Sequence, residues 1–324
     1  MAAPRTTAVA LAALVFLVVA ASFASVARSE PLAIVAAVRG RVEFTPAAGG
    51  APARASFGQA LERGDRVSVG PGGAATIFFD GGSVIELAEK SAIVIGGRAS
   101  AKPKAARVGL PGEVYASVSK FVTGGSRESG LVALSVLRGG TDATPLLVEP
   151  RRTEILDLRP SFRWRSVEGA ARYRIAVSGD SGELWSRETE GTVLEYPPDA
   201  AALAAAGAYA WEVRAFSDRG ELRREDSFFH VLEAGEAAAV RGALAKIRDA
   251  AGGPGAAAAR FLAGSYLFGR GLYGDAAAEF DSLARSSPDV PAPHEALGNV
   301  YRAIGLMDQA AAEYQQALTL SKQH

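Results

Sequence analysis

The sequence predicts a multidomain protein in which all-β modules are followed by an all-α end. Three observations lead to this fold class. Short β-prone runs separated by Gly-rich turns fill residues 31–140, strands that alternate apolar and polar side chains fill residues 145–232, and a 34-residue repeat fills residues 257–324. Strand side chains alternate with a period of two and helical side chains with a period of about 3.6, so the change of period marks the change of fold.

The composition excludes several classes of function. The 324 residues give room for about two or three domains. Because 35 Lys and Arg residues balance 35 Asp and Glu residues, we expect no general binding of nucleic acid. The absence of Cys excludes disulfides and thiolate metal sites. The three His residues, His230, His294 and His324, lie far apart, so we predict no metal site and no cofactor.

The N-terminus has the pattern of an export signal. Arg5 is the only charged residue before Arg28, and Ala, Val, Leu and Phe dominate between them. The small residues Ser25 and Ala27 predict cleavage after Ala27, which makes residues 1–27 a signal peptide. The alternative is an uncleaved membrane anchor, since about 20 apolar residues span a bilayer. Both outcomes place the remainder in the periplasm or cell envelope, with the membrane reached only through this segment.

Residues 31–140 are predicted to form the first β module. Asp-Gly and Gly-Gly pairs between the β-prone runs supply the positive φ angles of tight turns. The predicted strands are residues 34–38, 42–44, 66–69, 75–79, 83–87 and 92–95. Residues 114–122 and 131–137 are candidates for further strands.

The sequences VRGRV at 38–42, LERGDRV at 61–67 and ATIFFDGGSVIEL at 75–87 resemble the FecR domain, the periplasmic part of the ferric-citrate signalling regulators. The resemblance implies a β roll or sandwich. It makes structural turn residues of Gly40, Gly64, Asp65, Asp80 and Gly81. Signalling members carry a cytoplasmic helical segment before their membrane span, whereas four residues precede Arg5 here, so we expect no anti-sigma role.

Two patterns imitate chemical sites. Asp65 and Asp80 could form a carboxylate pair, but each adjoins Gly at a strand end, where Asp sets a turn by bonding the backbone. Residues 269–274 spell G-x-G-x-x-G, a motif that binds a dinucleotide only after a strand and at a helix start. This copy falls between two predicted helices. We therefore predict no catalytic residue and a protein that is not an enzyme.

Residues 145–232 are predicted to form a second β module. Strands are expected at residues 173–177, 182–187, 209–216 and 227–232. With Phe162 and Trp164 early and Tyr209 and Trp211 late, this region resembles a fibronectin type III-like domain, which implies a seven-stranded sandwich. The period of two places these aromatic side chains on one face, so we expect them in the core.

Helical spacing begins in residues 233–256, which are predicted to be one helix and a linker. Val240, Leu244 and Ile247 recur at helical spacing in residues 235–250, before the break at Gly252-Gly253-Pro254-Gly255. Two repeats are fewer than the three or so that usually bury a continuous core. We therefore expect this helix to pack on the first repeat as a cap.

The C-terminal region contains an internal repeat. Gly264, Gly271, Ala276, Glu279 and Phe280 recur 34 residues later as Gly298, Gly305, Ala310, Glu313 and Tyr314. This period resembles the tetratricopeptide (TPR) repeat, a helix–turn–helix unit, and gives two units at 257–290 and 291–324. In that unit the first glycine allows close helix approach, the second lies in the turn, and the alanine is small where helices cross.

The TPR resemblance also implies a binding groove, which the first helix of each unit lines. The implied groove residues are Phe261, Ser265 and Phe268 on one helix and Glu295, Asn299 and Arg302 on the next. Asn and Arg at such positions suit an extended peptide or its terminal carboxylate. The alternative is that the two Phe side chains pack between helices and Asn299 is solvated.

The favoured function is a cell-envelope scaffold or adaptor that binds a protein or peptide partner through the TPR groove, with the β modules as further interaction modules. One alternative is an envelope signal receptor or regulator related to FecR-type signalling. A second alternative is a protein that acts on or binds cell-wall glycans, since two distant carboxylates leave no local motif.

Overall fold

The computed structural model describes residues 30–97, 105–125 and 144–322. The predicted signal peptide at 1–27 and the strand candidate at 131–137 lie outside the described residues. Residues Pro31–His324 form one compact unit. Within it, β sheets precede a run of helices, as the change of sequence period predicts.

The first β module consists of two antiparallel sheets. One has the strand order β4-β1-β6-β7-β9 and the other the order β3-β2-β5-β8. The strands are β1 Ala33–Arg39, β2 Val42–Thr45, β3 Ala53–Arg54, β4 Ala60–Leu61, β5 Arg66–Val69, β6 Ala74–Phe79, β7 Ser83–Leu87, β8 Ala92–Val94 and β9 Ala105–Val108. Val35, Val67 and Ile77 are buried in the core that both sheets contribute to. The six strands predicted up to residue 95 are confirmed, with ends that differ by at most one residue.

The prediction of a strand at 114–122 is wrong, because this segment lies in helix α1, Gly112–Gly125. Its Val and Phe residues favour strands as single residues. The buried side chains are Val114, Tyr115, Val118 and Phe121, which share one helical face at spacings of one, four and seven. Burial of that face decides the structure, and the helical period of its apolar residues is the sequence signal for α1.

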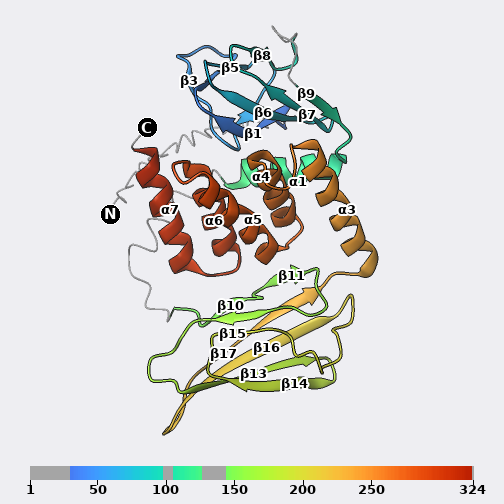
Figure 1. Cartoon of the computed structure of the whole chain (residues 1–324), viewed down its shortest axis with the longest axis vertical. Coiled ribbons are helices and arrows are strands. Elements are labelled where there is room, and N and C mark those ends of the chain that lie inside the picture. Colours follow the sequence, from blue (N-terminus) through green and yellow to red (C-terminus); the bar gives the residue numbers. More distant parts are fainter. Residues whose placement is uncertain (1–29, 98–104, 126–143, 323–324) are drawn as a thin grey trace, which may run out of the picture. The chain divides into compact units, whose positions relative to one another are not determined.

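The second β module has a three-stranded sheet, β10-β12-β15, and a five-stranded sheet, β11-β17-β16-β13-β14 (Figure 1). The strands are β10 Leu147–Glu149, β11 Thr153–Ile155, β12 Phe162–Trp164, β13 Arg172–Gly179, β14 Gly182–Thr189, β15 Val193–Leu194, β16 Ala208–Ser217 and β17 Gly220–Val231. Phe162, Trp164 and Trp211 are buried in one cluster, and Tyr209 packs against it. The aromatic residues therefore form the core, as predicted.

Five helices follow the sheets: α3 Ala234–Ala250, α4 Ala257–Gly269, α5 Tyr273–Ser286, α6 Pro291–Ala303 and α7 Met307–Ser321. Figure 1 shows α4 to α7 as successive neighbours, and each packs on the next. Helix α3 packs on α4, with Val240, Leu244 and Ile247 buried. The predicted packing of this helix on the first repeat is confirmed.

The helices and the first β module share one hydrophobic core. Ile34 of β1 and Phe78 of β6 belong to the same buried cluster as Phe121 of α1 and Leu262 of α4. Helix α1 packs along α4, and β1 also contacts α4. The apolar face of the first repeat is thus covered by the N-terminal half of the chain.

Candidate functional site

Each helical hairpin closes on one glycine and one aromatic ring. A Cβ atom placed on Gly264 of α4 would lie 2.7 Å from the nearest ring carbon of Phe280 on α5. One placed on Gly298 of α6 would lie within 2.6 Å of Cδ1 of Tyr314 on α7. Both rings therefore lie directly against the backbone of the preceding helix, and the two hairpins repeat this contact with the predicted 34-residue period.

The turns inside the hairpins also repeat. Gly271 and Gly305 have φ angles of 76° and 80°, a left-handed conformation that favours glycine. The backbone N–H of Leu272 donates to the carbonyl of Leu267 at 3.0 Å, and that of Leu306 donates to the carbonyl of Tyr301 at 2.8 Å. Shortly after each turn, a fully buried alanine packs where the helices cross; these are Ala276 and Ala310. The G-x-G-x-x-G sequence at 269–274 therefore spans an inter-helix turn.

The predicted groove residues on α4 are covered. Phe261 is 2% exposed, and its ring centroid lies 6.1 Å from that of Phe57. The hydroxyl of Ser265, also buried, donates to the carbonyl of Phe261 at 2.8 Å. Phe268 is half-buried, with its ring 5.0 Å from Phe121 and 5.2 Å from Tyr273. All three predicted groove side chains on α4 therefore contact other residues of the same protein.

Helix α1 covers the part of α4 around Phe268. The ring of Phe121 stacks on Phe280 with centroids 5.3 Å apart and also touches Phe268. A Cβ atom on Gly269 would lie 2.8 Å from Cβ of Ser117, so α1 and α4 approach closely there. The face of the first repeat predicted to bind a partner is thus covered by the same chain, with Phe57 against Phe261 and helix α1 against Phe268.

The predicted groove residues on α6 have three different environments. Asn299 is 6% exposed, and its Oδ1 accepts a hydrogen bond from the Tyr314 hydroxyl at 2.8 Å. Arg302 is half-buried. Burial raises the pKa of the Glu295 carboxyl, although the residue keeps an exposed surface.

The residues that resemble the FecR motif lie in turns. The Asp65 carboxylate accepts backbone hydrogen bonds from Ala47 and Glu62, each at 2.8 Å. Asp80 and Gly81 form the connection between β6 and β7. The positive φ angles of Gly40 and Gly64, 66° and 91°, suit turns between strands. The Asp65 carboxylate thus organises the backbone around two loops.

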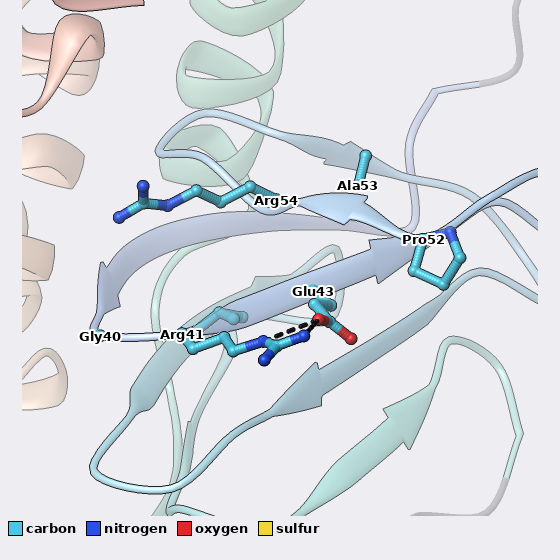
Figure 2. A pocket seen from close by; sticks show the side chains of 7 residues that line it. Gly40, Arg41, Glu43, Pro52, Ala53 and Arg54 are labelled. Atoms are coloured by element: carbon cyan, nitrogen blue, oxygen red, sulfur yellow. Dashed lines mark hydrogen bonds and ion pairs between the residues drawn. The ribbon is translucent and has the colours of Figure 1, made fainter. Parts of the chain in front are cut away.

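An open pocket of about 360 Å³, which no sequence pattern indicates, lies between β2 and β3 (Figure 2). Nε and Nη2 of Arg41 donate to Oε1 of Glu43 at 2.9 and 2.6 Å. Among the described residues, no hydrogen bond or ion pair holds the guanidinium of Arg54, which extends away from Glu43 (Figure 2). The pocket can offer this cation to an anionic group. Single surface arginines give no sequence signal for such a site.

A second pocket, of about 300 Å³, lies between β10, β11, α5 and α6. The rings of Tyr273 and Tyr301 line it, and Arg163 pairs with Glu149 at 3.0 Å. Burial, together with nearby acidic groups, raises the pKa of Tyr301. The charges at this junction are paired, so the pocket offers no free ion to a ligand.

The described residues contain no group of three or more His, Asp or Glu side chains placed to hold a metal ion. Over the same residues, no helix combines the length and the apolar character needed to cross a bilayer.

Comparison with known proteins identifies no family for this chain. No protein-family model matches it, and no curated protein matches it. Among solved structures, CopC from Methylosinus trichosporium OB3b is similar at 18% identity over 28% of this chain and 94% of CopC, with a TM-score of 0.20. The FN1–FN3 domains of chicken CNTN1 are similar at 12% identity over 62% of this chain and 57% of that chain, also with a TM-score of 0.20. Neither likeness is close enough to carry an argument about fold or function.

Proposed function

We propose that this protein is a non-enzymatic cell-envelope scaffold that binds a protein or peptide partner through its C-terminal repeats. The observation that carries the proposal is the tandem pair of helical hairpins, in which Gly264 meets Phe280 and Gly298 meets Tyr314. Tandem hairpins of this kind form extended binding surfaces in repeat proteins. The 34-residue period of the two contacts supports the assignment of the hairpins as TPR units. The β modules are proposed to be FecR-type and fibronectin III-like, and the N-terminal segment to direct export.

The proposed partner surface is the face of α6 that carries Glu295. Helix α1 packs on α4, so a partner could reach the corresponding face of α4 only by displacing α1. The second repeat is therefore the surface that we propose for the partner. Asn299 contributes by holding Tyr314 in place. Glu295 combines an exposed surface with a carboxyl that the surrounding protein shields, so a cationic or hydrogen-bond-donating group of a partner would gain from pairing with it.

Site-specific photo-cross-linking in the intact cell envelope tests this surface. The full chain carries a photoreactive residue at position 295 or, as a matched control, at the exposed position 316 on α7. We expect a discrete cross-linked partner at 295 and none at 316. Adducts that form from the β modules, with none from 295, would show that the repeats are not the binding surface.

A second function, binding of an anionic cell-wall component by the first β module, is favoured by the pocket beside Arg54. Co-sedimentation of the full chain with purified peptidoglycan tests it. Arg54→Gln should abolish retention, while Arg219→Gln, which removes the same charge from an exposed turn of the second module, should not. Equal retention of both variants would exclude the pocket.

A further inference from the structure

One short stretch of the second β module contains two buried polar side chains. Arg151 and Thr153 are 8% and 6% exposed, and Arg151 is the one Arg among the buried side chains of the described residues. Burying a charge is costly unless it is paired and hydrogen-bonded, and a buried ion pair often adds little stability. In some proteins, buried groups of this kind instead fix one arrangement of the fold against others. The contacts of this stretch show which arrangement it fixes.

The C-terminal part of the stretch holds the turn between α4 and α5. The backbone N–H of Glu154 donates to the carbonyl of Gly271 at 2.9 Å. The hydroxyl oxygen of Thr153 lies 3.0 Å from the same carbonyl and accepts the backbone N–H of Tyr273 at 2.9 Å. That N–H belongs to the first turn of α5, whose amides have no partner within the helix. Edge strand β11 therefore completes the start of α5.

The N-terminal part holds the equivalent turn of the second repeat. Nε of Arg151 donates to the carbonyl of Ile304 at 2.9 Å, and Nη1 pairs with Glu225 of β17 at 2.7 Å. The guanidinium of Arg152 lies beside Gly305, with Nη1 3.2 Å from where a Cβ atom would be. The second β module thus contacts the inter-helix turn of each hairpin, at Gly271 in the first and at Ile304 and Gly305 in the second.

Helices α5 and α6 also pack on each other directly. Apolar packing is non-directional and tolerates small rotations, whereas hydrogen bonds to two fixed carbonyls do not. Gly271 and Gly305 are equivalent positions of the repeat. Contacts that hold both turns therefore restrict how one hairpin can rotate relative to the next.

We propose that residues 151–154 form a registration element by which the second β module fixes the angle between the α4–α5 hairpin and the α6–α7 hairpin. The β module is then part of what shapes the repeat surface. This inference concerns the geometry of the chain alone and does not depend on the proposed partner.

Hydrogen exchange on the full chain tests the element, because its two anchors act on different turns. Thr153→Val keeps the side-chain shape but removes the acceptor for Tyr273. Arg151→Met keeps much of the apolar stem but removes the bond to Ile304. We expect Thr153→Val to speed exchange at the start of α5 about tenfold or more, with the start of α7 unchanged. Arg151→Met should instead speed exchange in the turn between α6 and α7, around Ile304, and leave the start of α5 unchanged.

Spin labels report the angle itself. The sequence has no Cys, so Ser286→Cys on α5 and Gln316→Cys on α7 give two unique labelling sites at exposed positions. The distance distribution between them should broaden in either anchor variant and stay narrow in Arg187→Met, which removes an exposed ion pair on β14. An unchanged distribution in both anchor variants would overturn the proposal. So would exchange that rises equally throughout the chain, because it would show general destabilisation.

Discussion

The glycine at each hairpin contact predicts a stability effect opposite to the usual one for a helix. Gly→Ala in an exposed helix raises the free energy of unfolding by about 0.5–1 kcal/mol, since Ala loses less backbone entropy. At Gly298 the new Cβ would meet three ring carbons of Tyr314 at distances below 3 Å. That ring is buried, and its hydroxyl is bonded to Asn299, so it cannot simply swing away.

Overpacking of this kind costs about 1–3 kcal/mol, and the short distances place Gly298→Ala near the upper end. After the helix gain of about 1 kcal/mol is subtracted, the net loss is about 2 kcal/mol, or a melting temperature lowered by about 4–8 °C. Gly264→Ala should lose less, about 1 kcal/mol, because its nearest ring carbons lie 2.7 to 3.0 Å away.

Gly242→Ala is the matched control. Gly242 lies in the exposed part of α3, and a Cβ atom there would meet nothing within 4 Å. Calorimetric melting of the three variants should show Gly242→Ala at or above the parent, Gly264→Ala below it and Gly298→Ala lowest. A Gly298→Ala protein that melts at or above the parent would refute the close ring–backbone contact.

Three further predictions concern a buried carboxyl, a buried ring and a buried hydrogen bond. Burial of the Asp275 carboxyl, with Asp157 and Glu149 nearby, raises its pKa to about 6 from 3.8, so the folded state holds this proton more tightly than the unfolded chain and loses stability as the pH rises from about 4 to about 6. Melting against pH should therefore show Asp275→Asn above the parent at pH 7.5 and level with it below pH 4; a constant offset would contradict the titration. Phe121→Ala should lower the free energy of unfolding by about 3–5 kcal/mol in urea, whereas truncation of a half-exposed ring, Phe228→Ala, should change it little. Asn299→Ala leaves the buried Tyr314 hydroxyl without this acceptor and should lower the free energy of unfolding by about 1–3 kcal/mol; a loss equally large in a Tyr314→Phe background would contradict the pairing.

Local patterns in the sequence were enough to locate most elements. Alternation of apolar and polar residues places β13 and β16 within one or two residues of their observed ends, and helical spacing does the same for α3. The 34-residue spacing predicts both hairpins because Gly, Ala and aromatic residues are each required by a close backbone contact. These signals depend only on neighbours within one element or one repeat.

The candidate site was harder to predict, because its environment comes from distant parts of the chain. Nothing near Phe268 in the sequence shows that Phe121 covers it, and helix α1 itself was hidden by β-prone residues. The hydrogen bond between Asn299 and Tyr314 joins a residue predicted to line the groove with a residue predicted to pack between helices, and no sequence pattern links the two. Arg151 gave no signal, since a single Arg in a strand region is most often solvated. Long-range packing decided each of these positions.

Binding of a partner to the α6 face of the second repeat can be tested through the affinity of the full chain for the partner cross-linked at position 295. Glu295→Lys reverses the charge on this face, whereas Gln316→Lys adds the same kind of residue on the exposed side of α7. We predict that Glu295→Lys raises the Kd about tenfold or more, while Gln316→Lys leaves it within about twofold and both variants keep the parent melting temperature. Equal affinities of both variants and the parent would contradict the claim.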